Sequence, residues 1–224
     1  MKNGIFTFLT GFLIAILIIT VSIGLPIYVR PFYYYQVDAL NIEAYSGADR
    51  ETIIEAYDEL MDYLTIPGNE FKTGKFKYSE SGKAHFVDCK VLFDLNLYAL
   101  ITAVLGLAIL FILNISGVFE LCRPFGKHVA FSSGLFTLTG FAVIGGLAAT
   151  DFDRAFTIFH KLFFPGKSNW LFSWYEDEII RILPQDFFMN CAILIFSSIV
   201  LLCVGCIITG LIQGYRAKLS KEFA

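Results

Sequence analysis

Four long stretches of the 224-residue chain contain no Asp, Glu, Lys or Arg, and the charged residues gather between them. The stretches are Gly4–Tyr28, Leu97–Ile115, Val129–Ala149 and Phe187–Ile212. A helix needs about 20 apolar residues to cross roughly 30 Å of hydrocarbon, because each residue advances it by about 1.5 Å. The pattern therefore predicts an all-α integral membrane protein with four transmembrane helices.

Composition supports this class and excludes others. Hydrophobic residues make up 56% of the chain and charged residues 17%, whereas a soluble domain carries about 25% charged residues. This excludes a soluble enzyme, a disordered protein and a nucleic-acid binder.

The first stretch is too long for a signal peptide and no small-residue cleavage site follows it, so we expect it to remain as an anchor. Pairs of small residues four apart predict close helix packing in a bundle: Gly11/Ala15, Ala142/Gly146 and Cys206/Gly210.

The charges between the stretches predict the topology. The two termini and the loop Ser116–His128 hold six basic and two acidic residues, residues 29–96 hold seven and twelve, and residues 150–186 hold four and six. By the positive-inside rule, both termini face the cytoplasm. The predicted organisation is a first transmembrane helix (1–28), an extracytoplasmic cap (29–96), two further transmembrane helices joined by a short cytoplasmic loop (97–149), a second extracytoplasmic segment (150–186), and a fourth transmembrane helix with a basic cytoplasmic tail (187–224).

The predicted cap is small and mostly helical. Ser46 and Asp49 are both candidate N-caps for an amphipathic helix of about four turns. Its apolar face comprises Ile53, Tyr57, Leu60 and Leu64. Pro67-Gly68 should end this helix. The alternation of aromatic residues and lysines over residues 71–78 then predicts a short hairpin or extended ribbon.

The second outer segment also contains a predicted helix. Asp153 is a plausible N-cap, and Pro165-Gly166 should end the helix. Four phenylalanines fall at helical spacing beside His160: Phe152, Phe156, Phe159 and Phe163. Aromatic side chains favour the membrane–water interface, so an ordinary aromatic belt accounts for most of the aromatic residues in both outer segments.

The spans contain no ionisable side chain other than Cys and Tyr, which argues against a pump, a secondary transporter or a voltage sensor. The chain has no G-x-S-x-G elbow, H-E-x-x-H motif, P-loop or dinucleotide fingerprint. A zinc site needs three or four ligands, and the outer segments hold only two histidines. We therefore predict no metal and no cofactor. Cys203-x-x-Cys206 lies within an apolar span, where two small packing residues are the simpler interpretation.

Three histidines remain as candidates for acid–base chemistry. His128 opens the third span beside Lys127 and is interpreted as an interfacial polar residue. His85 precedes the second span by about twelve residues, and His160 follows the third by about eleven. Both lie at similar depth, in different outer segments, among aromatic residues. They could be polar interfacial residues or a catalytic pair.

Two motifs and the plan of four spans resemble one family, the bacterial lipoprotein intramolecular transacylases (Lit). One motif is Ser79-Glu80 … His85-Phe-Val-Asp88-Cys-Lys90, leading into the second span. The other is Phe159-His160-Lys-Leu-Phe163-Phe164, followed by Trp170, Asp177 and Leu183-Pro184. The cap sequence Tyr57-Asp-Glu-Leu-Met-Asp-Tyr63-Leu64 is also similar. Cys89 departs from the family pattern, which more often has Val there.

The resemblance implies an acyltransferase of the bacterial cell membrane, with its active site on the extracytoplasmic side. It would move the sn-2 acyl chain of a diacylglyceryl lipoprotein to the free amino group of the N-terminal cysteine, giving the lyso-form. His85 and His160 correspond to the family's catalytic histidines. Six other motif residues are expected to bind or orient the substrate: Glu80, Asp88, Lys90, Arg154, Trp170 and Asp177.

This activity fits the residues, because donor ester and acceptor amine belong to one molecule and need no nucleophilic Ser or Cys. Two imidazoles suffice as base and acid. Asp88, three residues after His85, could orient that ring and mildly favours it as the base, although the two roles stay open. Cys89, four residues after His85, could instead form a thiol–imidazole pair, but a small packing residue is the simpler interpretation.

The expected partners are a diacylated lipoprotein and membrane lipids, with no nucleic acid, and the protein is expected to be a monomer. Two alternatives stay open. One is a non-enzymatic four-span protein that binds a lipid or a partner. The other is an intermolecular acyltransferase with a phospholipid donor.

Overall fold

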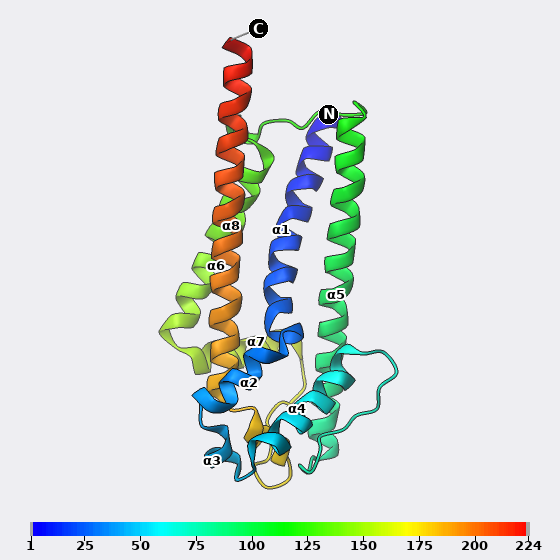
Figure 1. Ribbon diagram of the computed structural model, residues 1–224, viewed down its shortest axis with the longest axis vertical. Helices are drawn as coiled ribbons and strands as arrows, with labels where there is room; N and C mark the ends of the chain where they lie inside the picture. Colours follow the sequence, from blue (N-terminus) through cyan, green and yellow to red (C-terminus); the bar gives the residue numbers. More distant parts are fainter. Residues whose placement is uncertain (1, 223–224) are drawn as a thin grey trace. The chain divides into compact units, whose positions relative to one another are not determined.

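The computed structural model describes residues 2–222, with side chains as far as residue 219; Met1, Phe223 and Ala224 at the ends of the predicted first helix and tail lie outside the described residues. The elements in chain order are α1 (Lys2–Tyr28), α2 (Arg30–Ala39), α3 (Ile42–Ser46), α4 (Arg50–Thr65), α5 (Glu80–Ile115), the 3₁₀ turn η1 (Pro124–Gly126), α6 (Val129–Thr150), α7 (Phe152–Phe163), η2 (Glu178–Ile182) and α8 (Gln185–Glu222) (Figure 1). Residues 2–222 form no β-strand, so the predicted all-α class is confirmed.

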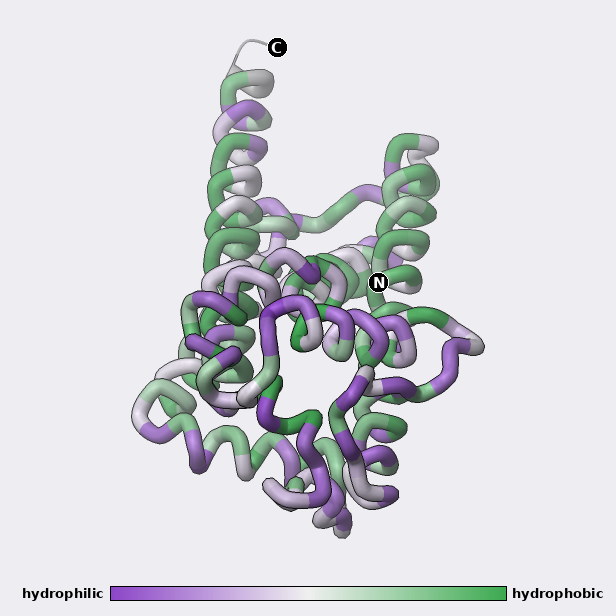
Figure 2. Tube along the Cα trace, turned by 60° about the horizontal axis from the view of Figure 1, so that its bottom comes forward, coloured by the Kyte–Doolittle hydropathy of each residue, from purple (hydrophilic) through white to green (hydrophobic). Residues whose placement is uncertain are grey.

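Four helices of the described chain are long and apolar enough to cross a membrane: Lys2–Tyr28, Glu80–Ile115, Val129–Thr150 and Gln185–Leu219. Figure 2 colours these helices mostly as hydrophobic and the segments around α4 as more hydrophilic. The four predicted spans are therefore confirmed. Helix α5 begins at Glu80, well before the charge-free stretch, because a helix bonds its own backbone groups and can continue through charged residues.

The chain divides into two compact units, and the first comprises residues 1–22, 97–146 and 196–224. Its helices approach closely at glycines. A Cβ atom at Gly134 would lie 2.8 Å from the carbonyl oxygen of Cys203, and one at Gly210 would lie 2.6 Å from the backbone nitrogen of Phe131. Only glycine permits these approaches of α6 to α8, as in small-residue packing of membrane helices. Cys203 is fully buried at this contact, as expected of a packing residue.

The second unit comprises residues 23–96 and 147–195. Its core contains Tyr33 of α2, which is fully buried and stacks on Tyr57 of α4 with ring centroids 3.6 Å apart. The hydroxyl of Tyr33 donates a hydrogen bond of 2.7 Å to the carbonyl oxygen of Ile182 in η2. Phe187 of α8 meets the Tyr33 ring edge-on at 5.2 Å. These contacts join the two predicted outer segments into one core.

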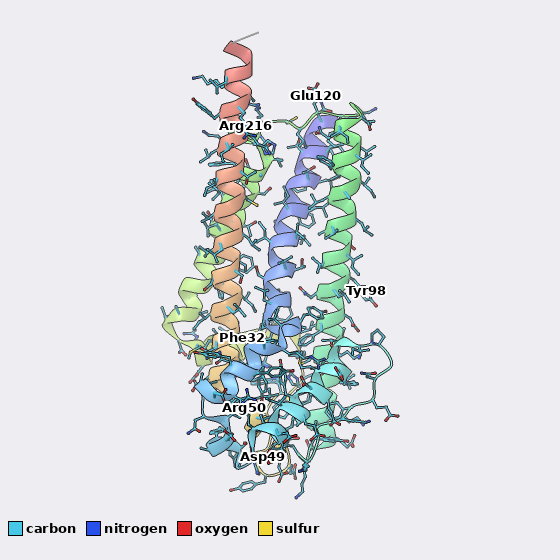
Figure 3. All side chains as sticks on the ribbon, in the orientation of Figure 1. Phe32, Asp49, Arg50, Tyr98, Glu120 and Arg216 are labelled. Atoms are coloured by element: carbon cyan, nitrogen blue, oxygen red, sulfur yellow. The ribbon has the colours of Figure 1, made fainter. Side chains whose placement is uncertain are left out.

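Helix α4 follows the amphipathic pattern of its sequence. Asp49, labelled in Figure 3, is its N-cap and accepts a hydrogen bond of 2.9 Å from the backbone nitrogen of Thr52, whereas Ser46 ends α3. The helix ends at Thr65, just before Pro67-Gly68. Its buried face holds Ile53, Ala56, Tyr57, Leu60, Met61 and Leu64. The buried face of α4 therefore forms a large part of the hydrophobic core of the second unit.

Two local predictions need correction. Of the two alternatives for residues 71–78, the hairpin is wrong, because residues 66–79 form no strand; the backbone nitrogen of Gly74 donates a hydrogen bond of 2.7 Å to the Glu59 carboxylate of α4, and Gly74 has φ +56°. Side-chain acceptors thus replace a strand ladder there. The N-cap of α7 is Asp151, not Asp153, and accepts a bond of 2.9 Å from the nitrogen of Arg154. Asp151 precedes the helix in an extended conformation, which frees its carboxylate to reach back to that nitrogen.

Candidate active site

His160 lies in the last turn of α7 and is buried. Its Nδ1 atom is 2.7 Å from the carbonyl oxygen of Phe156, one turn earlier. A carbonyl oxygen can only accept, so Nδ1 carries the proton and Nε2 keeps a free lone pair. The indole of Trp170 stacks on the imidazole with centroids 4.7 Å apart. The ring is therefore fixed in both tautomer and orientation.

His85 lies in the second turn of α5 and is 5% exposed. The rings of Phe164 and Phe172 meet it edge-on at 4.8 and 5.5 Å. Its Nε2 atom lies 3.4 Å from the sulfur of Cys89, one turn later. Its Nδ1 atom is buried and has no hydrogen-bond partner among the described residues. A buried nitrogen without a hydrogen-bond partner lowers the stability of the fold, and such an atom is typical of a site that binds a ligand.

The two imidazoles face each other with ring centroids 5.6 Å apart and planes inclined by 33°. The two outer segments thus bring both imidazoles within reach of one ligand head group. Burial lowers the pKa of His160 below its ordinary value of 6.5, although the bond to the Phe156 carbonyl acts in the opposite direction. His160 is therefore neutral near pH 7 and able to accept a proton.

Both rings line a cavity of about 760 Å³ that lies wholly within the second unit. This volume is in the range of small-molecule sites. The wall is mainly apolar, with aliphatic and aromatic side chains from α1, α4, α5, α7 and α8. Such a wall suits acyl chains, and the imidazoles supply polar atoms within it. In the described part of the chain, no group of three or more His, Cys, Asp or Glu could hold a metal ion.

Asp177 is a positioning residue of this cavity. It is 2% exposed, and its two carboxylate oxygens accept bonds of 2.7 and 2.9 Å from the backbone nitrogens of Ser79 and Ser173. It therefore ties the start of α5 to the loop before η2. A Cβ atom at Gly82 would lie 2.3 Å from the Asp177 Oδ1 atom, so the absence of a side chain at Gly82 permits this junction.

Asp88 does not orient His85 by a hydrogen bond, contrary to the expectation from its spacing. Its carboxylate accepts bonds of 2.5 Å from Lys167 and 2.9 Å from Asn169. The indole nitrogen of Trp170 donates 3.1 Å to the carbonyl oxygen of Lys167. Asp88 therefore fixes the loop that places Trp170 against His160. Lys167 and Asn169 were missed by the sequence analysis, and only their proximity to the Pro165-Gly166 turn could have indicated them.

Like Asp88 and Asp177, the other three predicted substrate-binding residues do not line the cavity. Lys90 donates to the carbonyl oxygens of Tyr63 and Ile66 and so caps the end of α4. Glu80 and Arg154 are exposed in the first turns of α5 and α7. His128 belongs to the first unit, where its Nδ1 atom accepts a bond of 3.2 Å from the nitrogen of Ala130. Of the six candidates, Trp170 alone lines the cavity.

The family model described as "Lipoprotein intramolecular transacylase Lit" matches residues 8–188. The chain belongs to the Lit family. The resemblance seen in the sequence is therefore confirmed, and the protein is a membrane-integral enzyme, a lipoprotein intramolecular transacylase. No curated protein sequence matches the chain.

Solved structures agree with the Lit assignment. The in meso structure of the membrane integral lipoprotein intramolecular transacylase Lit from Bacillus cereus is 25% identical, covers 99% of this chain and 97% of its own, and has a TM-score of 0.83. Two structures of that Bacillus cereus protein with one histidine replaced, by Arg or by Ala, are 23% identical, with TM-scores of 0.80 and 0.79. They cover 98% and 100% of this chain and 95% and 96% of their own.

Proposed function

We propose that this Lit-family enzyme moves the sn-2 acyl chain of a diacylglyceryl lipoprotein to the α-amino group of its N-terminal cysteine, giving the lyso-form, without an acyl-enzyme. The observation that carries the proposal is the pair of buried imidazoles, 5.6 Å apart, on the wall of one apolar cavity. A substrate holding both ester and amine needs only a base, an acid and confinement.

His160 is the base in this mechanism. Its Nδ1 proton is held by the Phe156 carbonyl, so Nε2 presents a lone pair. An α-amino group has a pKa of about 7.7–8.0, and a neutral imidazole beside it can take its proton as the nitrogen attacks the ester carbon. The hydrogen-bonding of Asp88 to Lys167 and Asn169 removes the reason to favour His85 as the base.

His85 is the acid. Burial and the neighbouring His160 lower the pKa of His85 to about 4, so this ring also starts neutral near pH 7. The proton that His160 takes from the amine therefore passes to His85, directly or through one water, and the resulting imidazolium gives it to the sn-2 glyceryl oxygen as the bond from that oxygen to the acyl carbon breaks. The substrate has then lost one proton from nitrogen and gained one on oxygen, and both rings are neutral again. The chemistry balances with no cofactor and no external acyl donor.

The cavity supplies the remaining requirement, which is a reactive conformation. Amine and ester must meet in a medium-sized ring, and a pocket that holds both acyl chains raises their effective concentration. The balance of six basic against two acidic residues in the termini and the loop Ser116–His128 supports cytoplasmic termini and an extracytoplasmic site.

The test is incubation of the purified protein, in phospholipid-free detergent, with one diacylated lipopeptide whose sn-1 and sn-2 chains differ in length. Intramolecular transfer leaves the total mass unchanged and moves the mass of the sn-2 chain to the peptide fragment in tandem mass spectrometry. A product heavier by one acyl chain, formed only with added phospholipid, would identify an intermolecular acyltransferase instead. Unchanged fragments would contradict any acyl transfer.

A further inference from the structure

One face of α7 lines the cavity from the start of the helix to its end. The lining positions are Asp153, Phe156, Thr157, Phe159, His160 and the C-cap Phe164. All of them except Phe159 recur at the three- and four-residue spacing of a single helical face. Asp153 therefore stands on the same wall as His160, and neither its N-cap interpretation nor the family motifs account for it.

Asp153 is chemically distinct in this wall. Among the described residues that line the cavity, it alone carries a formal charge at neutral pH. The other titratable side chains there are histidine, tyrosine and cysteine. A single carboxylate at the edge of an apolar cavity favours a cation of matching size at that point.

The carboxylate stands where the cavity opens. Asp153 is exposed, as is Gln185 at the start of α8, which donates a hydrogen bond to Asp153 Oδ1. Two exposed aromatic residues of the lining, Tyr45 and Trp174, meet edge-on at 5.2 Å. The second oxygen of Asp153 has no hydrogen-bond partner within residues 2–222. The mouth thus presents one fixed carboxylate with a free acceptor.

Asp153 and His160 are seven residues apart along α7, or about 10.5 Å along the axis at 1.5 Å per residue. The His160 ring bonds back to the carbonyl oxygen of Phe156, which brings the imidazole closer to Asp153 than this spacing. A cation held at Asp153 is therefore between one and two helical turns from the imidazole, on the same wall of the cavity.

We propose that Asp153 is a specificity residue that receives the α-ammonium group of the lipoprotein substrate at the cavity mouth. The group loses one proton to bulk water there, and His160 takes the second proton as the free amine attacks the ester. The inference rests on the proposed function. An amine arriving as a cation is stabilised by the carboxylate while it is still partly in water. The product has an uncharged amide, so it loses this attraction and leaves more readily. A lipoprotein that is already N-acylated is disfavoured for the same reason.

The experiment compares two unreactive lipopeptides as inhibitors of the purified full chain. One carries an Nα,Nα-dimethyl group, which keeps the positive charge but cannot form a stable amide; the other carries an Nα-acetyl group and is neutral. At low salt the cationic inhibitor should bind about two- to fivefold tighter, in line with a partly exposed ion pair. The preference should vanish as salt screens the pair.

Asp153→Asn should remove the same preference and raise KM for the substrate by about two- to fivefold, with kcat little changed. Asp186→Asn is the matched control, because Asp186 is exposed in the first turn of α8 and does not line the cavity. Equal inhibition by both lipopeptides in the wild type would overturn the inference without requiring any variant to fold. A kcat loss with unchanged KM in Asp153→Asn would also overturn it. Failure of the wild type to make lyso-form would instead refute the proposed function.

Discussion

Nδ1 of His160 donates a hydrogen bond of 2.7 Å to the carbonyl oxygen of Phe156, one turn back in the same helix. This bond decides which ring nitrogen is free and points the base at the cavity. His85, the opposite ring, has a buried nitrogen with no partner among the described residues. The asymmetry between the two rings is the structural basis for giving them different roles.

Replacing either ring should abolish most catalysis. We expect His85→Ala and His160→Ala each to reduce lyso-form production by about 10²- to 10⁴-fold, the usual contribution of general acid–base catalysis. His128→Ala should stay near wild type, because His128 belongs to the first unit and the cavity to the second. Initial rates by mass spectrometry, with thermal melting to verify folding, provide the measurement. Normal turnover in either ring variant, or an equal loss in His128→Ala, would refute the site.

The pKa of His160 should be lower than the ordinary value for a histidine. Burial lowers its pKa below 6.5, so the ring should remain neutral as pH falls to 6.5 and charge only at lower pH. The unfolded chain binds that proton first, so His160 makes folding less stable as pH drops below about 6.5. NMR of labelled histidine, assigned with His160→Ala, gives the midpoint. A midpoint at or above 6.5 would contradict the buried, neutral base.

Gly82→Ala should destabilise the second unit. In an open helix, Gly→Ala stabilises by about 1 kcal/mol, but here the new Cβ would lie 2.3 Å from the carboxylate of Asp177. Gly214→Ala in α8 is the matched control, since no atom lies within 4 Å of its added Cβ. We expect a lower Tm for the Gly82 variant and an unchanged or higher Tm for the control. A Tm rise in both would show that the Asp177 junction tolerates a side chain.

The sequence predicts correctly those elements whose residue pattern lies within one continuous segment. The charge-free stretches predicted four spans, and the apolar face from Ile53 to Leu64 predicted α4. The sequence does not predict hydrogen bonds between side chains of segments that are far apart in the chain. Nothing near Asp88 indicates that Lys167 and Asn169 will bind it, and the spacing to His85 suggested a different contact. The alternation over residues 71–78 was misleading because Glu59, on another element, satisfies the backbone at Gly74.

Cys89 should not become acylated. Its sulfur lies 3.4 Å from His85 Nε2, which is the geometry a thiol–imidazole pair would need. An acyl-enzyme helps when donor and acceptor arrive separately, whereas here both belong to one substrate. We expect Cys89→Ala to retain most activity and the intact protein mass to stay constant during turnover. A gain of one acyl chain on the wild type, together with loss of activity in Cys89→Ala, would establish covalent catalysis.

The central claim is that the acyl chain never leaves its own molecule, and a crossover experiment tests it most directly. Two diacylated lipopeptides of different peptide mass, one with deuterated acyl chains, are mixed in equal amounts with the purified protein. The account predicts that every N-acylated product carries a chain of its own label, with total mass unchanged. Products that pair one peptide with the other's label, in a statistical mixture, would contradict intramolecular transfer.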